Sequence, residues 1–262
     1  MKIFIFDLDG TLLKNDKTIS LTTTACLKSL HQKGYLIGYV TARTKRKLQE
    51  LLTDLPCNFI ASYDGAMIDV YIDDKEINIA NECICDEVAH KIISDLSGIE
   101  GMDVFSYFEP YHVMNDKVST IGLCNIERYD NTTKMLFSGC QRIRGRIKNS
   151  PIESLKLPKF SDVYMYFENA YVVYRNIGVN KGKAVNIILE YYGINKEDAV
   201  CFGDSEPDID MFKECGISVA MGNANDFVKK CATRVTGSNE DNGIVSAIEK
   251  LVGEGCESEK FD

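Results

Sequence analysis

Short apolar runs alternate with helix-like stretches over the first third of the chain. Residues 3–6, Ile-Phe-Ile-Phe, form an unbroken apolar run, as expected of a strand buried on both faces of a parallel sheet. The runs and amphipathic stretches that follow predict a helix at 20–33, a strand at 35–40, a helix ending near 52, and strands at 57–62 and 66–72. This order predicts an α/β fold with a doubly wound, Rossmann-like parallel sheet.

The rhythm breaks near residues 78–85 and resumes about 90 residues later. Between these points we expect a helix at 86–96, aromatic strand material at 103–114, a basic segment at 143–147, and a hairpin of strands 162–166 and 171–174. We interpret residues 81–175 as an inserted α+β domain and residues 1–80 and 176–262 as one core. Inserted domains at the ligand end of a sheet commonly act as lids.

The alternating pattern returns in the last third of the chain. A helix is expected at 181–192, ending at Gly193, strands at 199–202 and 217–221, and a final helix at 243–252. These elements extend the predicted core sheet beyond the insert.

Composition and charge narrow the classes of function. The 262 residues are 45% hydrophobic and 26% charged, which is ordinary globular usage and argues against disorder. A net charge of -9 without a long basic tract argues against nucleic-acid binding, although a few local cations could hold a small anionic substrate. No apolar run approaches the roughly 20 residues of a membrane helix, and the first strand begins at once, without room for a cleavable signal. We therefore expect a cytoplasmic protein without membrane contact.

The ten cysteines include no CxxC pair and are interpreted as reduced thiols, several of them in the core. Cys83 and Cys85 with nearby His90 could suggest a metal site. Structural zinc normally takes four ligands in a recognisable spacing, so this alternative is disfavoured.

The first apolar run ends in Asp7, Asp9 and Gly10. If the backbone stays extended, the two aspartates project to the same side, and ligands of α/β sheets bind at this end of the strands. Two close carboxylates repel each other, and a divalent cation is the usual remedy. The alternative is a strand followed by an ordinary Asp-Gly turn.

Other strand ends and one helix start also carry polar groups. These are Thr41, Asp204, Asp208 and Asn223, with Lys181 opening a helix between them. Each has a structural alternative: a helix cap for Thr41, a solvated helix residue for Lys181, turn or first-turn acids for the aspartates, and a left-handed turn for Asn223. Together they converge on phosphoryl chemistry.

At this point the sequence resembles the haloacid dehalogenase-like superfamily of phosphohydrolases over nearly the whole chain. Its four motifs resemble, in order, Asp7-Leu8-Asp9-Gly10-Thr11, Thr41-Ala42-Arg43, Asn180-Lys181-Gly182 and Gly203-Asp204-Ser205-Glu206-Pro207-Asp208. The insert and the turn Gly222-Asn223-Ala224 resemble the α/β cap and a late loop of the Cof-like subfamily.

The resemblance implies a Mg²⁺-dependent phosphatase that works through an aspartyl-phosphate. Asp7 would attack phosphorus, and Asp9 would protonate the leaving alcohol and then activate water. Mg²⁺ would be held by Asp7, the backbone carbonyl of Asp9, and Asp204. Asp208 would orient Lys181 or the waters on the metal.

The resemblance also implies which groups bind the phosphoryl oxygens. Thr41 and the amide of Ala42 would hold one oxygen, and Lys181 would add a positive charge. Gly10, Arg43 and Asn223 complete the implied set of phosphate-binding residues. The expected substrate is a small phosphorylated metabolite, either a sugar phosphate or a phosphorylated cofactor such as a flavin or pyridoxal nucleotide.

Aromatic residues of the insert are the candidates for selecting the substrate. The aromatics Tyr107, Tyr111, Tyr166 and Tyr171 are interpreted as core of the insert in preference to ligand contacts. The basic run Arg142, Arg144, Arg146 and Lys148 is interpreted as a solvated face. The pattern says nothing of oligomeric state.

Pro207 is the main departure, because the family commonly has asparagine there. Asp64, where asparagine is also common, is a milder one. A phosphomutase that uses the same aspartyl-phosphate, or a weakly active or non-catalytic phosphate-binding module, therefore remain alternatives. A phosphoacceptor receiver domain would lack the insert, and a dinucleotide-binding oxidoreductase would have G-x-G-x-x-G after the first strand, which is absent.

Overall fold

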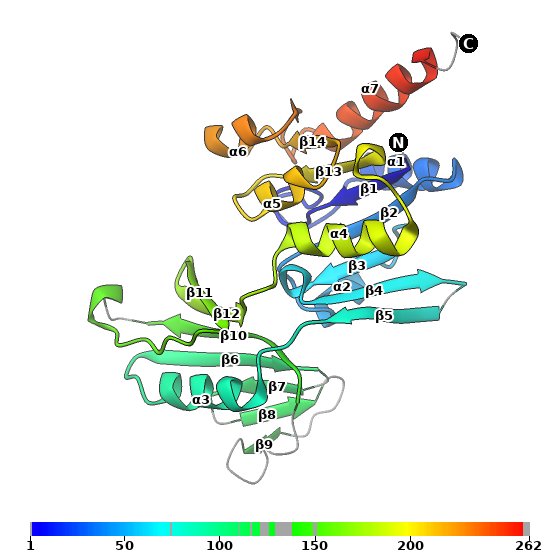
Figure 1. The fold of residues 1–262 in the computed structure, drawn as a ribbon. Coiled ribbons are helices and arrows are strands. Elements are labelled where there is room, and N and C mark those ends of the chain that lie inside the picture. The colour runs from blue at the N-terminus through cyan, green and yellow to red at the C-terminus, as the bar shows by residue number, and fades with distance from the viewer. Residues whose placement is uncertain are drawn as a thin grey trace. The chain divides into compact units, whose positions relative to one another are not determined.

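The computed structural model describes residues 2–73, 75–109, 111–115, 117–120, 126–128, 138–148 and 151–258. The chain forms two compact units, drawn in Figure 1. One unit, here called the core unit, consists of Met1–Ile79 and Asn180–Asp262, and the other, the insert, consists of Ala80–Val179.

The core unit is built on an eight-stranded sheet. Its order is β15 (Arg234–Val235), β14 (Ile217–Ala220), β13 (Ala199–Gly203), β1 (Ile3–Phe6), β2 (Leu36–Val40), β3 (Phe59–Ser62), β4 (Met67–Ile72) and β5 (Lys75–Asn81). The strands from β15 to β3 pair in parallel, whereas β4 pairs antiparallel with β3. All four residues of β1 are buried, as the apolar run predicted. The α/β fold class is confirmed, with a mixed edge on an otherwise parallel sheet.

Helices connect and cover the strands of the core unit. They are α1 (Leu21–Gln32), α2 (Arg46–Leu51), α4 (Lys181–Tyr192), α5 (Asp208–Lys213), α6 (Asp226–Cys231) and α7 (Gly243–Ser258). Side chains of α1 and α7, such as Leu30 and Ile248, share one buried cluster with Phe4 and Phe6 of β1. On the other side, α4 contacts β2 and β3 and packs beside α5 (Figure 1). No helix in the described ranges is long and apolar enough to cross a membrane.

The insert contains a seven-stranded sheet. Its order is β11 (Val163–Glu168), β12 (Tyr171–Asn176), β10 (Cys140–Ile147), β6 (Met102–Phe108), β7 (Tyr111–Met114), β8 (Lys117–Thr120) and β9 (Ile126–Arg128), with all six ladders antiparallel. Helix α3 (Asp86–Ser97) packs on β6 and β10, where Ile92 and Leu96 meet Val104 and Ile143. This separate antiparallel sheet fits the α+β character that the sequence predicts.

The structure corrects two interpretations of side chains in the insert. Arg142 is only 3% exposed, so the basic run is not a solvated face along its whole length, although Arg146 and Lys148 are exposed. Alternate residues of β10 point to opposite faces, and Arg142 lies over the Tyr107 ring, 5.8 Å from its centroid. Tyr111 packs against the core beneath α3, as interpreted. The rings of the other three candidate tyrosines, Tyr107, Tyr166 and Tyr171, instead lie next to arginine guanidinium groups.

Candidate active site

The first strand ends at Phe6, immediately before Asp7. Residues 8–13 turn back on themselves, with the amide of Leu13 donating to the carbonyl oxygen of Leu8 at 2.8 Å. The backbone therefore does not stay extended from Asp7 to Asp9, and the condition under which the two aspartates would project to the same side is not met.

Gly10 allows this turn to pass close to a second acid. Gly10 has φ +83°, and a Cβ there would lie 2.4 Å from a carboxylate oxygen of Asp204. Only glycine fits both constraints. Thr11, the next residue, donates from Oγ1 to Asp204 at 3.0 Å, so the turn and the end of β13 are joined.

Lys181 is buried between two carboxylates. Its Nζ lies 2.6 Å from Oδ1 of Asp7 and 2.6 Å from Oδ1 of Asp208. Asn180 caps α4 by accepting from the amide of Lys183 at 2.7 Å, so the helix starts with Lys181 at its first position. Burial alone would lower the pKa of Lys181, but the charges of Asp208 and Asp7 raise it above its usual range. The interpretation of Lys181 as a solvated helix residue is therefore wrong.

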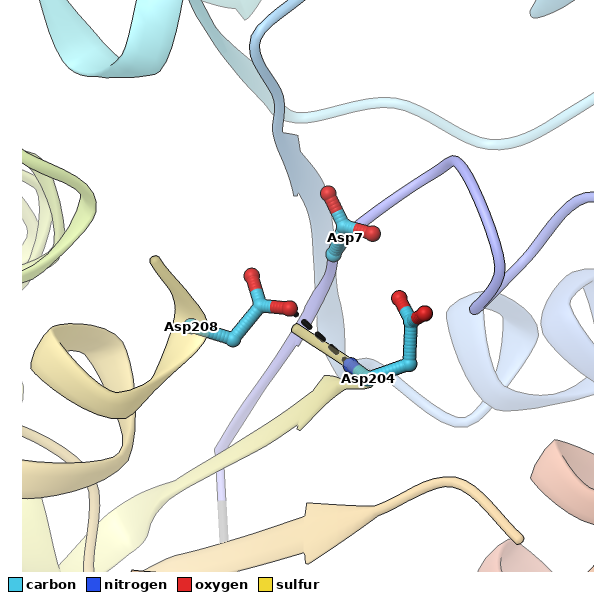
Figure 2. A group of neighbouring side chains, drawn as sticks. All are labelled: Asp7, Asp204 and Asp208. Carbon is cyan, nitrogen blue, oxygen red and sulfur yellow. Dashed lines mark hydrogen bonds between the residues drawn. The ribbon is translucent and has the colours of Figure 1, made fainter. Parts of the chain in front are cut away.

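The carboxylates of Asp7, Asp204 and Asp208 lie close together (Figure 2), with one oxygen of each within 4.8 Å of the others. Burial raises the pKa of Asp7 to about 8, opposed by Lys181 and reinforced by Asp208 and Asp204. Burial, and then the charge of Asp208, raises the pKa of Asp204 to about 6. Fully ionised, the three carboxylates would carry more negative charge than one ammonium balances, so Asp7 and Asp204 bind protons more readily than free aspartates do.

This donor set fits a hard divalent cation. Carboxylate oxygens are the ligands that Mg²⁺ prefers, and a cation would relieve the repulsion between Asp7 and Asp204. Asp208 is less available, because its Oδ2 already accepts from the amides of Asp204 and Ser205 and from Ser205 Oγ, each at 2.9 Å. Within the residues that the structure describes, this is the one cluster of potential metal-binding side chains; Cys83, Cys85 and His90 do not form another.

Two cations bind the carboxylate of Asp9. Arg43 donates from Nε and Nη2 to both oxygens of Asp9, each at 2.7 Å, and Lys17 Nζ lies 2.9 Å from Oδ1. The hydrogen bonds from Arg43 are the main cause that lowers the pKa of Asp9 to about 2. In this arrangement Arg43 contacts Asp9, a pairing that the motif comparison did not anticipate.

Thr41 lies buried at the end of β2. Its Oγ1 accepts from the amide of Arg43 at 3.1 Å, which shapes the Thr41-Ala42-Arg43 turn. Helix α2 begins only at Arg46 and has no side-chain cap, so the interpretation of Thr41 as a helix cap is wrong. Thr41 remains a candidate for phosphate binding.

Asn223 and Pro207 support the backbone around the acids. Asn223 donates from Nδ2 to the carbonyl oxygen of Gly10 at 2.8 Å, which fixes the turn after β1. Pro207 has φ -58° and directly precedes α5, a conformation that suits its ring and leaves Asp208 as the first helical residue. The departure at Pro207 thus leaves the backbone of the fourth motif able to place Asp208.

Comparisons with known proteins agree with this geometry. The family model for haloacid dehalogenase-like hydrolases matches residues 4–248. The 5-amino-6-(5-phospho-D-ribitylamino)uracil phosphatase YitU of Bacillus subtilis is 26% identical, over 95% of this chain and 96% of the relative.

Among solved structures, a haloacid dehalogenase-like hydrolase from Bacteroides thetaiotaomicron superposes with a TM-score of 0.78 at 21% identity, covering 95% of this chain and 99% of the other. The sugar phosphatase BT4131 superposes with a TM-score of 0.76 at 22% identity, covering 96% and 99%. These structural likenesses extend over both units of the chain.

Proposed function

The chain belongs to the haloacid dehalogenase-like hydrolases, and on that premise we propose that it is a Mg²⁺-dependent phosphatase acting through an aspartyl-phosphate on Asp7. Phosphoric monoester hydrolysis is the activity named for its relatives. The observation that supports the mechanism best is the buried ion pair of Lys181 with Asp7, next to Asp204 and Asp208. We also propose that the protein is cytoplasmic.

The nucleophile is the carboxylate of Asp7. Lys181 favours its ionised form and adds positive charge where the phosphoryl oxygens gather. Asp208 holds Lys181 from the other side and keeps its ammonium in place. Mg²⁺ would be held by Asp7, Asp204 and the backbone carbonyl of Asp9, and would neutralise charge between carboxylate and phosphate.

Asp9 would act as the general acid and the general base of the reaction. As a carboxylate beside Arg43 it is in the form that takes a proton from water when the aspartyl-phosphate is hydrolysed. To protonate the leaving alcohol in the first step, it must release Arg43 and bind a proton. Thr41 and the amide of Ala42 would hold a phosphoryl oxygen, while Gly10 and Asn223 shape the loop beneath it.

We propose a sugar phosphate or a phosphorylated cofactor or its precursor as the substrate. Relatives named as phosphatases of 5-amino-6-(5-phospho-D-ribitylamino)uracil, and a structural neighbour named as a sugar phosphatase, support this choice. We also propose that the insert acts as the cap that selects among such molecules.

The test is phosphate release from an aryl phosphate and from a panel of sugar and cofactor phosphates, with Mg²⁺ or with chelator. Asp7→Asn should reduce release at least about 10³-fold, because the nucleophile is lost. Asp16→Asn, which removes an exposed acid from the same loop, is the control and should retain activity.

Release that persists in Asp7→Asn, or that ignores the chelator, would contradict this function. Conversion of a substrate into an isomer without free phosphate would instead identify a phosphomutase.

A further inference from the structure

The face of the insert sheet turned away from α3 carries a layer of arginines. On β10, Ile143 lies in the core beneath α3, so alternation places Arg142, Arg144 and Arg146 on the opposite face. In β12, Arg175 is the register partner of Arg142 and shares that face.

This face concentrates positive charge. Arg142 and Arg175 stand directly opposite each other in a ladder, an arrangement of like charges that destabilises a sheet. With Arg144 and Arg146, four guanidinium groups lie on two neighbouring strands of a chain whose net charge is -9. Such local clustering attracts anions against the sign of the whole molecule.

Tyrosine rings lie next to two of these guanidinium groups. The central carbon of Arg144 lies 4.0 Å from the centroid of the Tyr171 ring. That of Arg175 lies 5.2 Å from the Tyr164 ring and 5.5 Å from the Tyr166 ring. A guanidinium that contacts an aromatic ring keeps the N–H donors of its own plane for an acceptor, so these contacts are compatible with binding of a planar oxyanion.

Arg144 and Arg175 also have donors without acceptors. The Nε of each is buried and has no hydrogen-bond partner among the described residues. Arg175 donates from Nη1 to the carbonyl oxygen of Val179, and Arg144 approaches Glu168 only to 3.9 Å, too far for a charge-assisted hydrogen bond. A buried N–H without an acceptor is costly, and a ligand oxygen would remove that cost.

Two side chains of this layer are partly exposed to solvent. The Arg144 side chain is 23% exposed and Tyr164 is 48% exposed. Arg142 is only 3% exposed, so it would attract an anion through its charge without contacting it.

We propose that Arg144 and Arg175, framed by Tyr164, Tyr166 and Tyr171, form a subsite for an oxyanion, either a carboxylate or a phosphate group of a small molecule. The assignment of that molecule as the substrate rests on the proposed function. The substrate is then a phosphate ester that carries a second oxyanion besides the phosphoryl group it loses.

The kinetic test compares phenyl phosphate with 4-carboxyphenyl phosphate and with 1,4-phenylene bisphosphate. The wild type should favour one of the two anionic esters about tenfold or more in kcat/KM, mainly through KM, because it gains charge-assisted hydrogen bonds. Which ester is favoured distinguishes a carboxylate from a phosphate ligand.

Variants assign that preference to the subsite. In Arg144→Gln and Arg175→Gln the ratio between the two esters should fall to near one, whereas Arg146→Gln should retain it. Arg146 is the matched control, since it lies on the same strand and face but is exposed. A ratio that survives in both subsite variants, or that Arg146→Gln abolishes equally, would overturn the proposal. If either glutamine variant fails to fold, Arg144→Lys and Arg175→Lys take its place. These variants keep the positive charge but lack the pair of parallel N–H donors of a guanidinium, so they should still lose most of the preference between the two esters.

A binding measurement separates this proposal from the proposed function. The arginine Nε–H signals of the full-length protein would be followed by NMR during titration with terephthalate, which carries no phosphoryl group. The signals of Arg144 and Arg175 should shift and saturate, while that of Arg146 stays in place. Saturation without phosphate release from any ester would keep the subsite and reject the phosphatase; normal release without these shifts would reject the subsite.

Discussion

At the scale of single residues, the charge of Lys181 holds the candidate site together. One ammonium faces two carboxylates at 2.6 Å inside the protein, and all three side chains are nearly fully buried. Removing one partner of a buried ion pair leaves uncompensated charge, which costs more than the pair itself contributes.

Lys181→Met should therefore lower the free energy of unfolding by about 3–5 kcal/mol and abolish phosphate release. Urea denaturation and the aryl phosphate assay measure the two effects. Lys183→Met removes an exposed lysine two positions along the same helix and should change stability by less than about 0.5 kcal/mol. Equal losses of stability and of phosphate release in the two variants would mean that the buried ion pairs of Lys181 contribute nothing to either property.

Asp204 makes stability depend on pH when no cation is bound. Its pKa in the folded protein is raised to about 6, so folding favours its protonated form. That contribution is complete below the ordinary pKa of about 4 and is lost as pH rises through 6. In chelator, Asp204→Asn should therefore gain stability over the wild type as pH rises from 4 to 7.

Urea denaturation at several pH values checks this prediction, with the difference between variant and wild type as the readout. Mg²⁺ should reverse the order at neutral pH, because it binds the carboxylate and not the amide. A difference that stays constant from pH 4 to 7 in chelator would show that Asp204 titrates normally.

At the scale of elements, helix starts place the reactive groups. Asn180 caps α4 and sets Lys181 at its first turn, and Pro207 precedes α5 and sets Asp208 there. Both helices follow loops, so a shift in either start would move a charged group relative to Asp7.

Asn180→Ala should cost about 0.5–2 kcal/mol of stability and also lower kcat, because α4 loses the cap that fixes Lys181. Asn225→Ala removes the equivalent cap of α6 and should cost similar stability with little change in kcat. Asn180→Asp preserves a capping oxygen and should restore much of both properties. A loss of stability in Asn180→Ala with kcat unchanged would contradict this coupling.

The elements also show what a sequence pattern can and cannot predict. Fully buried strands such as β1 and β13 stand out as apolar runs, and their polar ends identify the candidate acids. β5 was not predicted, because it is an edge strand whose side chains are mostly exposed and follow no apolar pattern. The pairing of Arg43 with Asp9 was missed for a different reason: it depends on the turns after two strands, whose geometry the residue types do not determine.

At the scale of the whole molecule, the two units have separate hydrophobic cores. Phe4 and Phe202 belong to the cluster of the core unit, and Ile92 and Val172 to that of the insert. A ligand of the core unit should therefore stabilise the two units unequally.

Mg²⁺ at about 100 times its dissociation constant should raise the free energy of opening of the core unit by up to about 2.7 kcal/mol. Hydrogen exchange followed by mass spectrometry would show the gain in peptides of β1 and β13, and much less in those of β6 and β10. Asp204→Asn should abolish the gain. Equal protection across both units would indicate that they open together.

The ladder between β1 and β13, which joins Ile3 to Ala199, has a consequence for synthesis. At about 5–20 residues per second, β1 leaves the ribosome on the order of 10–40 s before its partner exists. The strands of the insert are complete well before β13 is made, and they pair among themselves. During synthesis the nascent chain can thus contain a folded insert while the core unit is still incomplete. One edge of the fully apolar β1 is then unpaired, and a chaperone would have to shield that edge.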